Sequence, residues 1–170
     1  PDLQLVIAGP DKVGLKAELQ RLADKYGIGD KITWPGMLKG DMKWGAYLNA
    51  EAFILPSHQE NFGIVVAEAL SCSLPVLMRD KVNIWRETGE DNAGVVANDT
   101  GDGCVDLLNR WHEMDGNGKN EMRTNASRCF TERFEISQAA KSILMAVDRR
   151  SKIRPNLDSE SSIPTPSNLT

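Results

Sequence analysis

The sequence predicts an α/β domain in which helices cover both faces of a parallel β-sheet. Short apolar runs rich in β-branched residues alternate with amphipathic segments, and Gly or Pro residues separate the two kinds of segment. A strand, a helix and a second strand in succession give parallel neighbours. The chain has 170 residues, of which 41% are hydrophobic, so it can form one domain with a continuous core. We expect that domain to span residues 1–150.

Five apolar runs predict the strands of this sheet. The first, residues 3–8, ends at Gly9 and Pro10, and the third, residues 52–55, ends at Pro56. The others are residues 31–34, 75–78 and 93–97. Parallel sheets of this kind bind ligands at the carboxyl ends of their strands. The turns that follow these runs are therefore the expected place of a functional site.

The segments between the strands predict helices. Asp11 is expected to cap a helix whose apolar face holds Leu15, Leu19, Leu22 and Ala23. Further helices are expected at residues 41–49, 62–72, around Trp85, and at 103–114, 121–134 and 136–149, with a polar break at 115–120. The tail, residues 151–170, is rich in Ser and Pro and is expected to be disordered.

Charge and cysteine usage exclude several classes of protein. The net charge of −4 gives no general attraction to nucleic acid, so no nucleic-acid partner is expected. No apolar run is long enough to cross a bilayer. The cysteines Cys72, Cys104 and Cys129 stand far apart, which favours reduced thiols and a cytoplasmic location over disulfides or a zinc site.

The turn after the third predicted strand is the most informative segment: Pro56-Ser-His-Gln-Glu-Asn-Phe-Gly-Ile-Val-Val-Ala-Glu68. Asn61, Phe62 and Gly63 lie at the amino end of a predicted helix, where unpaired N–H groups attract an anion. Glu60 stands directly before that helix, at the mouth of the expected cleft. His58, in the same turn, is expected to be exposed and to bind no metal.

Glu68 is the one charge in an otherwise apolar helical segment, which we expect to be buried nearly all round. An unpaired carboxylate there would cost several kcal/mol. It therefore needs either a structural Arg or Lys or the hydroxyl groups of a ligand. The alternative is that the two glutamates have no functional role. Acids near helix amino ends are common, and two glutamates eight residues apart can be a coincidence.

The segment from Glu60 to Glu68 resembles the Glu-x7-Glu motif of retaining glycosyltransferases of family four (group 1), which have two Rossmann-like domains. The similarity covers residues 3–96 in order and spacing. It includes Leu5-Val-Ile-Ala-Gly-Pro10, Lys43-Trp44, Phe53-Ile-Leu-Pro-Ser57, Ala67-Glu-Ala-Leu70, Pro75-Val76 and Asn83-Ile-Trp-Arg-Glu87. The chain is thus identified as the C-terminal, donor-binding half of such an enzyme, with a Rossmann-like fold.

The resemblance implies a role for each residue that matches the motif. Glu68 would accept hydrogen bonds from the ribose hydroxyls of a nucleotide, and Glu60 would be the catalytic carboxylate that orients the donor sugar. Asn61 and the amides of Phe62, Gly63 and Ile64 would hold sugar hydroxyls or the diphosphate. Gly9 and Pro10 would form the turn beside the diphosphate, and Gly36, Met37 and Leu38 would pack on the base. Asp11 departs from the pattern, because many members have a second Gly there.

The chemistry implied is transfer of a hexose-type sugar from a nucleoside diphosphate sugar to an acceptor such as a polysaccharide or glycolipid precursor. The anomeric configuration would be kept by front-face attack, with the departing diphosphate as base. No cofactor and no metal are expected, since the sequence has no Asp-x-Asp pair to clamp a metal on the diphosphate.

The resemblance also implies that the chain is truncated at its N-terminal end and inactive alone. Family members carry an Arg and a Lys for the diphosphate upstream of the first strand, and an N-terminal acceptor domain. Peripheral association with the inner face of a membrane is expected through that missing half. A non-catalytic sugar-nucleotide-binding module is the main rival hypothesis. An unrelated nucleotide-binding protein is disfavoured, because Gly-x-Gly-x-x-Gly and Gly-x-x-x-x-Gly-Lys are both missing from the sequence.

Overall fold

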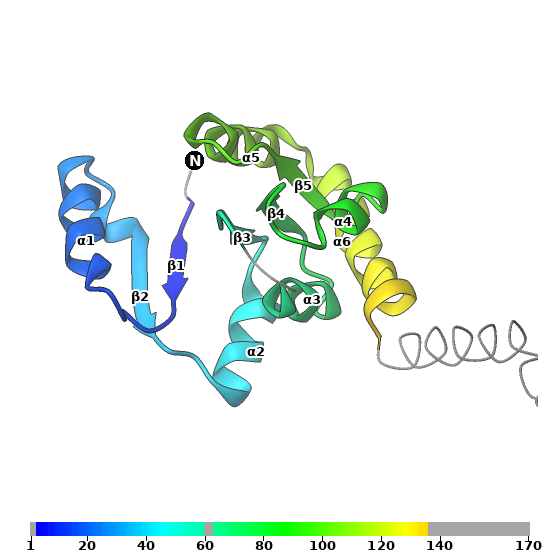
Figure 1. Ribbon diagram of the computed structural model, residues 1–170, viewed down its shortest axis with the longest axis horizontal. Helices are drawn as coiled ribbons and strands as arrows, with labels where there is room; N and C mark the ends of the chain where they lie inside the picture. Colours follow the sequence, from blue (N-terminus) through cyan, green and yellow to red (C-terminus); the bar gives the residue numbers. More distant parts are fainter. Residues whose placement is uncertain (1–2, 60–62, 136–170) are drawn as a thin grey trace, which may run out of the picture.

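The computed structural model of the protein describes residues 3–59 and 63–135, and every strand pair in it is parallel (Figure 1). Strand β1 (Leu5–Ala8) pairs with β2 (Ile32–Gly36). Strands β3 (Phe53–Leu55), β4 (Val76–Arg79) and β5 (Gly94–Ala97) form a second sheet in that order. The predicted parallel α/β architecture is confirmed, but the strands lie in two sheets rather than in one.

A helix follows each of these strands, as the alternating pattern predicts. In the segments expected to be helical, the described chain forms helices whose ends differ from the predicted ones by a few residues. They are α1 (Leu15–Lys25), α2 (Gly40–Asn49), α3 (Ile64–Ser71), α4 (Trp85–Glu90), α5 (Gly101–Glu113) and α6 (Gly116–Cys129), with a 3-10 turn at Gly29–Lys31 and a π-helical turn, η2, at Phe130–Phe134.

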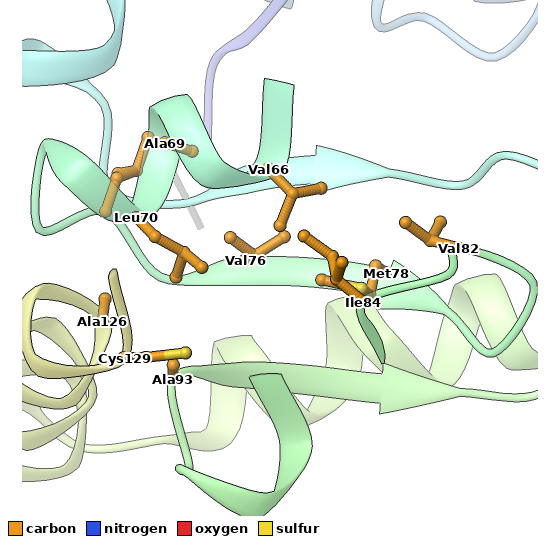
Figure 2. Packing of buried hydrophobic residues seen from close by; sticks show 11 residues of the cluster. Val66, Ala69, Leu70, Val76, Met78, Val82, Ile84, Ala93, Ala126 and Cys129 are labelled. Carbon is orange, nitrogen blue, oxygen red and sulfur yellow. The ribbon is translucent and has the colours of Figure 1, made fainter. Parts of the chain in front are cut away.

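Strand β4 lies at the centre of the core, because all four of its residues are buried. Successive side chains of a strand point to opposite faces of the sheet. Val76 and Met78 accordingly pack with Val66 and Leu70 of α3 on one face (Figure 2), where α6 also contributes Ala126. This face is the larger part of the hydrophobic core.

The opposite face of the same sheet is covered by α5. Leu77 of β4 and Val95 of β5 pack there against Leu107 and Trp111. Helices therefore cover both faces of the β3–β4–β5 sheet, as expected for a Rossmann-like domain.

Gly94 allows β4 and β5 to pair closely at the start of β5. A Cβ at this position would collide with the carbonyl oxygen of Val76, its partner in the sheet. No residue with a side chain can stand there unless the backbone shifts.

The largest differences between predicted and observed helix starts are at α1 and α6. Helix α1 is preceded by Gly14, whose φ of 75° lies in the left-handed region, and Asp11 instead accepts a long hydrogen bond of 3.4 Å from the Lys16 amide. Helix α6 begins at Gly116, inside the segment predicted as a polar break. It can begin there because the Asp115 side chain accepts a hydrogen bond of 2.8 Å from the Gly118 amide, a capping interaction that offsets two helical glycines.

The predicted helix at 136–149 and the predicted disordered tail at 151–170 lie outside the described residues. Among the helices of the described part, none combines the length and the apolar character needed to span a bilayer.

Candidate functional site

The carboxyl ends of β3, β4 and β5 meet at one edge of their sheet, where sequence reasoning places the site. The turn from β3 to α3 leaves this edge and contains the segment that resembles the Glu-x7-Glu motif. Within it, the predicted catalytic residue Glu60 and its neighbours Asn61 and Phe62 lie outside the described residues. The described part of the site consists of the residues before Glu60 and after Phe62.

Gly63 directly precedes α3 at this edge of the sheet. Its φ of 66° and ψ of 40° are left-handed, and a Cβ would approach Val82 Cγ1 to 3.2 Å. Both constraints favour glycine. Gly63 itself has no side chain to cap the helix, and Ile64 follows with 62% of its surface exposed. A helix amino end at this edge is consistent with the predicted anion site, which stays a prediction.

The expected all-round burial of α3 is wrong. The helix buries Val66, Ala69 and Leu70 against β4, but Ile64 is 62% exposed and Val65 is 36% exposed. The reason is that α3 buries one side against the sheet. In the described chain its outward side stays open to solvent at Ile64 and partly open at Val65, whose carbonyl accepts a 3.5 Å hydrogen bond from the Tyr47 hydroxyl. Glu68 belongs to the boundary between the two sides, with 21% of its side chain exposed.

Glu68 has two partners on α2. Lys43 Nζ lies 2.6 Å from Glu68 Oε1, and the Tyr47 hydroxyl donates to Oε2 over 3.4 Å. The structural cation that the sequence leaves open as an alternative is thus present. Because the Lys43 side chain is 32% exposed, we expect the pair to contribute only about 1 kcal/mol. Each carboxylate oxygen can still accept a further hydrogen bond.

Tyr47 links this ion pair to an aromatic cluster. Its ring lies 5.6 Å from Phe53 of β3 and 6.0 Å from Trp44, measured between ring centroids, and Lys43 Nζ stands 4.7 Å above the Trp44 ring. Burial, and then the charge of Glu68, raise the pKa of Tyr47 to about 12. Tyr47 therefore remains a hydroxyl donor to Glu68 at neutral pH.

Lys43 and Tyr47 could have been found from the sequence. They stand four residues apart on a predicted helix, so they share one face of it. What the sequence does not contain is the packing of α2 beside α3, which brings that face to Glu68.

The residues predicted for the diphosphate turn and the base loop lie at the ends of β1 and β2. The Gly9 amide donates to the Gly36 carbonyl over 2.9 Å, which holds the two strand ends together. Pro10 is exposed, Met37 is 54% exposed and Leu38 is half-buried. Within the described chain, no hydrogen bond or ion pair joins this group to Glu68 or to Gly63.

A second polar cluster lies at the carboxyl edge of the β3–β4–β5 sheet. His58 follows β3, Arg79 ends β4 and Asp99 follows β5, and we call these three residues the His58 cluster. Asp99 Oδ1 accepts from Arg79 Nη1 at 2.9 Å and lies 2.8 Å from His58 Nδ1. The His58 side chain is 80% exposed, as expected. The sequence points to the turns after Met78 and Ala97, but gives no signal that Arg79 and Asp99 meet.

A hollow in the surface lies apart from this edge. A hollow of about 550 Å³, lined by Ser73, Arg123, Arg128 and Glu132 among others, opens at the amino end of β4, because Ser73 precedes that strand. It is an open hollow at the edge opposite to the one where ligands of parallel sheets bind. In the residues that the structure describes, no group of three or more His, Cys, Asp or Glu side chains is placed to hold a metal ion.

Fold and strand order define an α/β domain whose parallel sheet is covered by helices on both faces, and comparison with known families makes this specific. The family described as glycosyl transferases group 1 matches residues 1–128 of the chain. The chain belongs to this family. The resemblance found in the sequence is confirmed.

Relatives of known sequence include D-inositol 3-phosphate glycosyltransferases. That of Mycolicibacterium smegmatis is 36% identical over 80 residues, which are 45% of this chain and 18% of that protein. That of Xylanimonas cellulosilytica is 27% identical over 143 residues, which are 81% of this chain and 33% of that protein. The chain thus spans a third or less of the length of these relatives.

Solved structures share the fold. HepE from Anabaena in complex with UDP has a TM-score of 0.74 at 17% identity, over 88% of this chain and 42% of that one. The C-terminal domain of the group 1 glycosyl transferase LpcC from Francisella tularensis has a TM-score of 0.66 at 20% identity, over 79% of this chain and 70% of that one. The Rossmann-like fold is therefore confirmed.

Proposed function

We propose that the chain forms the donor-binding half of a retaining glycosyltransferase. It binds a nucleoside diphosphate sugar at the carboxyl edge of its sheet, and the whole enzyme transfers the sugar to an acceptor such as a polysaccharide or glycolipid precursor. The observation that carries the proposal is the start of α3. In a chain of this family, α3 begins at that edge directly after Gly63 and places Glu68 on its boundary with solvent.

In this proposal Glu68 binds the ribose. Lys43 and Tyr47 hold its two oxygens in place, so the carboxylate is oriented before the nucleotide arrives. Two ribose hydroxyls then donate to the lone pairs that remain. The presence of UDP in the HepE complex supports a nucleotide as the ligand of this fold. Gly36, Met37 and Leu38 would pack on the base.

The donor sugar and the diphosphate lie at the amino end of α3. The amides of Phe62, Gly63 and Ile64 donate to them, and the positive end of the helix dipole stabilises the charge that grows on the diphosphate. Asn61 lies at the same helix end, and Gly9 and Pro10 form a turn beside the diphosphate. Glu60 orients the sugar hydroxyls near the anomeric carbon.

The reaction breaks the bond between the anomeric carbon and the diphosphate oxygen. The acceptor oxygen forms its bond to the same face of that carbon, and its proton passes to the departing diphosphate. The protein contributes orientation and preorganised hydrogen-bond donors, without metal or cofactor.

Nucleotide binding separates a ligand role of Glu68 from a purely structural one. We expect Glu68→Ala to weaken the binding of uridine diphosphate about tenfold or more, because charge-assisted hydrogen bonds to the ribose are lost. Lys43→Met removes the cation but leaves the carboxylate, so its affinity should stay within about fivefold of wild type. Isothermal titration calorimetry measures both variants. Glu113→Ala, an exposed glutamate on α5, is the matched control. Unchanged affinity in Glu68→Ala would make Glu68 a structural partner of Lys43 only.

The rate of sugar transfer tests the catalytic role proposed for Glu60. In the full-length enzyme, Glu60→Ala should lower the rate of sugar transfer about a hundredfold with little change in nucleotide affinity, because Glu60 acts at the reacting carbon. Equal rates in the variant and the wild type remove Glu60 from catalysis. A full-length wild type that binds the nucleotide sugar but never transfers it supports the rival, a non-catalytic binding module.

A further inference from the structure

The His58 cluster joins the carboxyl ends of three adjacent strands. His58 follows β3, Arg79 is the last residue of β4, and Asp99 follows β5. The Arg79 and Asp99 side chains are 9% and 19% exposed, whereas the His58 side chain is 80% exposed. A largely buried ion pair therefore supports an imidazole that faces solvent.

The contact with Asp99 assigns the proton on the ring. His58 Nδ1 lies 2.8 Å from Asp99 Oδ1, and a carboxylate oxygen can only accept a hydrogen bond when ionised. Arg79 Nη1 also donates to this oxygen at 2.9 Å. Nδ1 must therefore carry a hydrogen, which fixes the orientation of the ring.

Arg79 touches the face of the ring rather than its edge. Its Nη1 lies 3.2 Å from Nδ1 and 3.4 Å from Nε2. An atom at nearly equal distance from both nitrogens in the ring plane would collide with the carbon between them, so Nη1 lies above the plane. Guanidinium groups stack on planar rings in this way. Arg79 thus leaves the in-plane position of Nε2 open.

The position of Nε2 suits a ligand. The described residues place no hydrogen-bond partner in the ring plane at Nε2. His58 belongs to the turn between β3 and α3, on the edge of the sheet where ligands of parallel sheets bind. Gly63 and the amino end of α3 close the same turn.

We propose that His58 is a further donor-binding residue, which contacts a diphosphate oxygen of the nucleotide sugar through Nε2 while Asp99 and Arg79 orient its ring. The proposal rests on the proposed function, because it needs a nucleoside diphosphate at this edge. A diphosphate oxygen only accepts hydrogen bonds, so in the bound state Nε2 carries a hydrogen and donates it to the phosphate.

Imidazole NMR tests the geometry without any activity measurement. The chain has only two histidines, so His112 on α5 provides an internal reference. In the ligand-free 170-residue chain labelled with ¹⁵N-histidine, His58 should be protonated on Nδ1. On addition of uridine diphosphate, Nε2 of His58 should shift and the ring of His112 should not. A His58 ring that carries its single proton on Nε2 overturns the proposal.

Binding affinities test whether His58 contacts the diphosphate of the ligand. We expect His58→Ala to weaken the binding of uridine diphosphate about tenfold and to leave the binding of uridine unchanged, because uridine shares the base and ribose but has no phosphate. Asp99→Asn should cause a smaller loss through misorientation of the ring, and His112→Ala no loss. Circular dichroism checks that each variant is folded.

The two proposals fail differently. If wild type binds uridine diphosphate and His58→Ala binds it equally well, only the role of His58 is wrong. The same conclusion follows if His58→Ala weakens uridine and uridine diphosphate alike. If the wild-type chain binds neither uridine diphosphate nor any other nucleoside diphosphate, the proposed function fails, and the role of His58 with it.

Discussion

Residues 3–36 and residues 50–134 use the same kinds of segment but pack very differently. In the first region, apolar side chains of β1 and α1 remain at the surface: Val6 is 54% exposed, and Leu19 is 41% exposed. In the second, Val76, Leu70 and Leu107 are fully buried. Among the described residues of the first region, Ala23 is the one buried hydrophobic residue.

The difference shows that a pattern of apolar residues predicts a face but not its burial. Helix α1 presents its leucines on one side, as periodicity predicts, yet no described element covers them. Strand β4 has helices on both faces and a strand on each edge. Burial of apolar area provides most of the folding free energy, so we expect the two regions to differ in stability.

The largest difference is expected in amide hydrogen exchange. The amides of β4 should exchange at least about a hundredfold more slowly than those of β1 and β2, because opening β4 exposes the main core. Exchange followed by mass spectrometry or NMR on the 170-residue chain measures this. Equal protection of the two sheets would mean that both regions unfold as one unit, which would contradict the expected difference in stability.

A pair of matched leucine truncations should differ by a few kcal/mol. Leu70→Ala opens a cavity in the core and should lower the free energy of unfolding by about 3 kcal/mol. Leu19→Ala removes a half-exposed side chain and should lower it by about 1 kcal/mol or less. Urea denaturation of both variants gives the two values. A loss at Leu19 as large as that at Leu70 would show that α1 is covered in solution.

A smaller and pH-dependent effect is expected at Asp91, which secures the end of the second region. Its oxygens bind Nε and Nη2 of Arg133 at 2.7 Å each. The hydrogen bond from Arg133 lowers the pKa of Asp91 below its ordinary value. The ionised carboxylate is therefore the form that stabilises the fold. Its contribution is complete at neutral pH and is lost as the pH falls through the lowered pKa.

Asp91→Asn should therefore lower the free energy of unfolding by about 1 kcal/mol at neutral pH. The gap from wild type should narrow as the pH is lowered below about 4. Urea denaturation across this range measures the gap. A gap that does not change with pH would assign the loss to packing rather than to the charge.

Much of the fold can be predicted from the sequence, because strands and helices follow from local periodicity and from Gly and Pro positions. The start of α6 could not be predicted, since a capping aspartate outweighs two glycines only when the backbone places Asp115 beside the Gly118 amide. The division into two sheets is likewise a matter of long-range pairing, which local patterns do not contain.

The candidate site likewise combines features that are local in the sequence with contacts that are not. Gly63 and the unusual place of Glu68 are visible in one short segment of sequence. The ion pair with Lys43 and the meeting of Arg79 with Asp99 join residues 20 or more positions apart. Such contacts depend on which helix lies beside which strand, so they are found only in the folded chain.

The division into two sheets has a practical consequence. In the described chain β1 pairs only with β2, and β3 pairs only with β4, so each sheet ends in a strand with one open side. Unsatisfied backbone groups along such a side recruit any compatible extended segment, which in a concentrated solution is another copy of the molecule. A segment that bonded to β1 with one side and to β3 with the other would merge the two sheets into the single one that the sequence predicts.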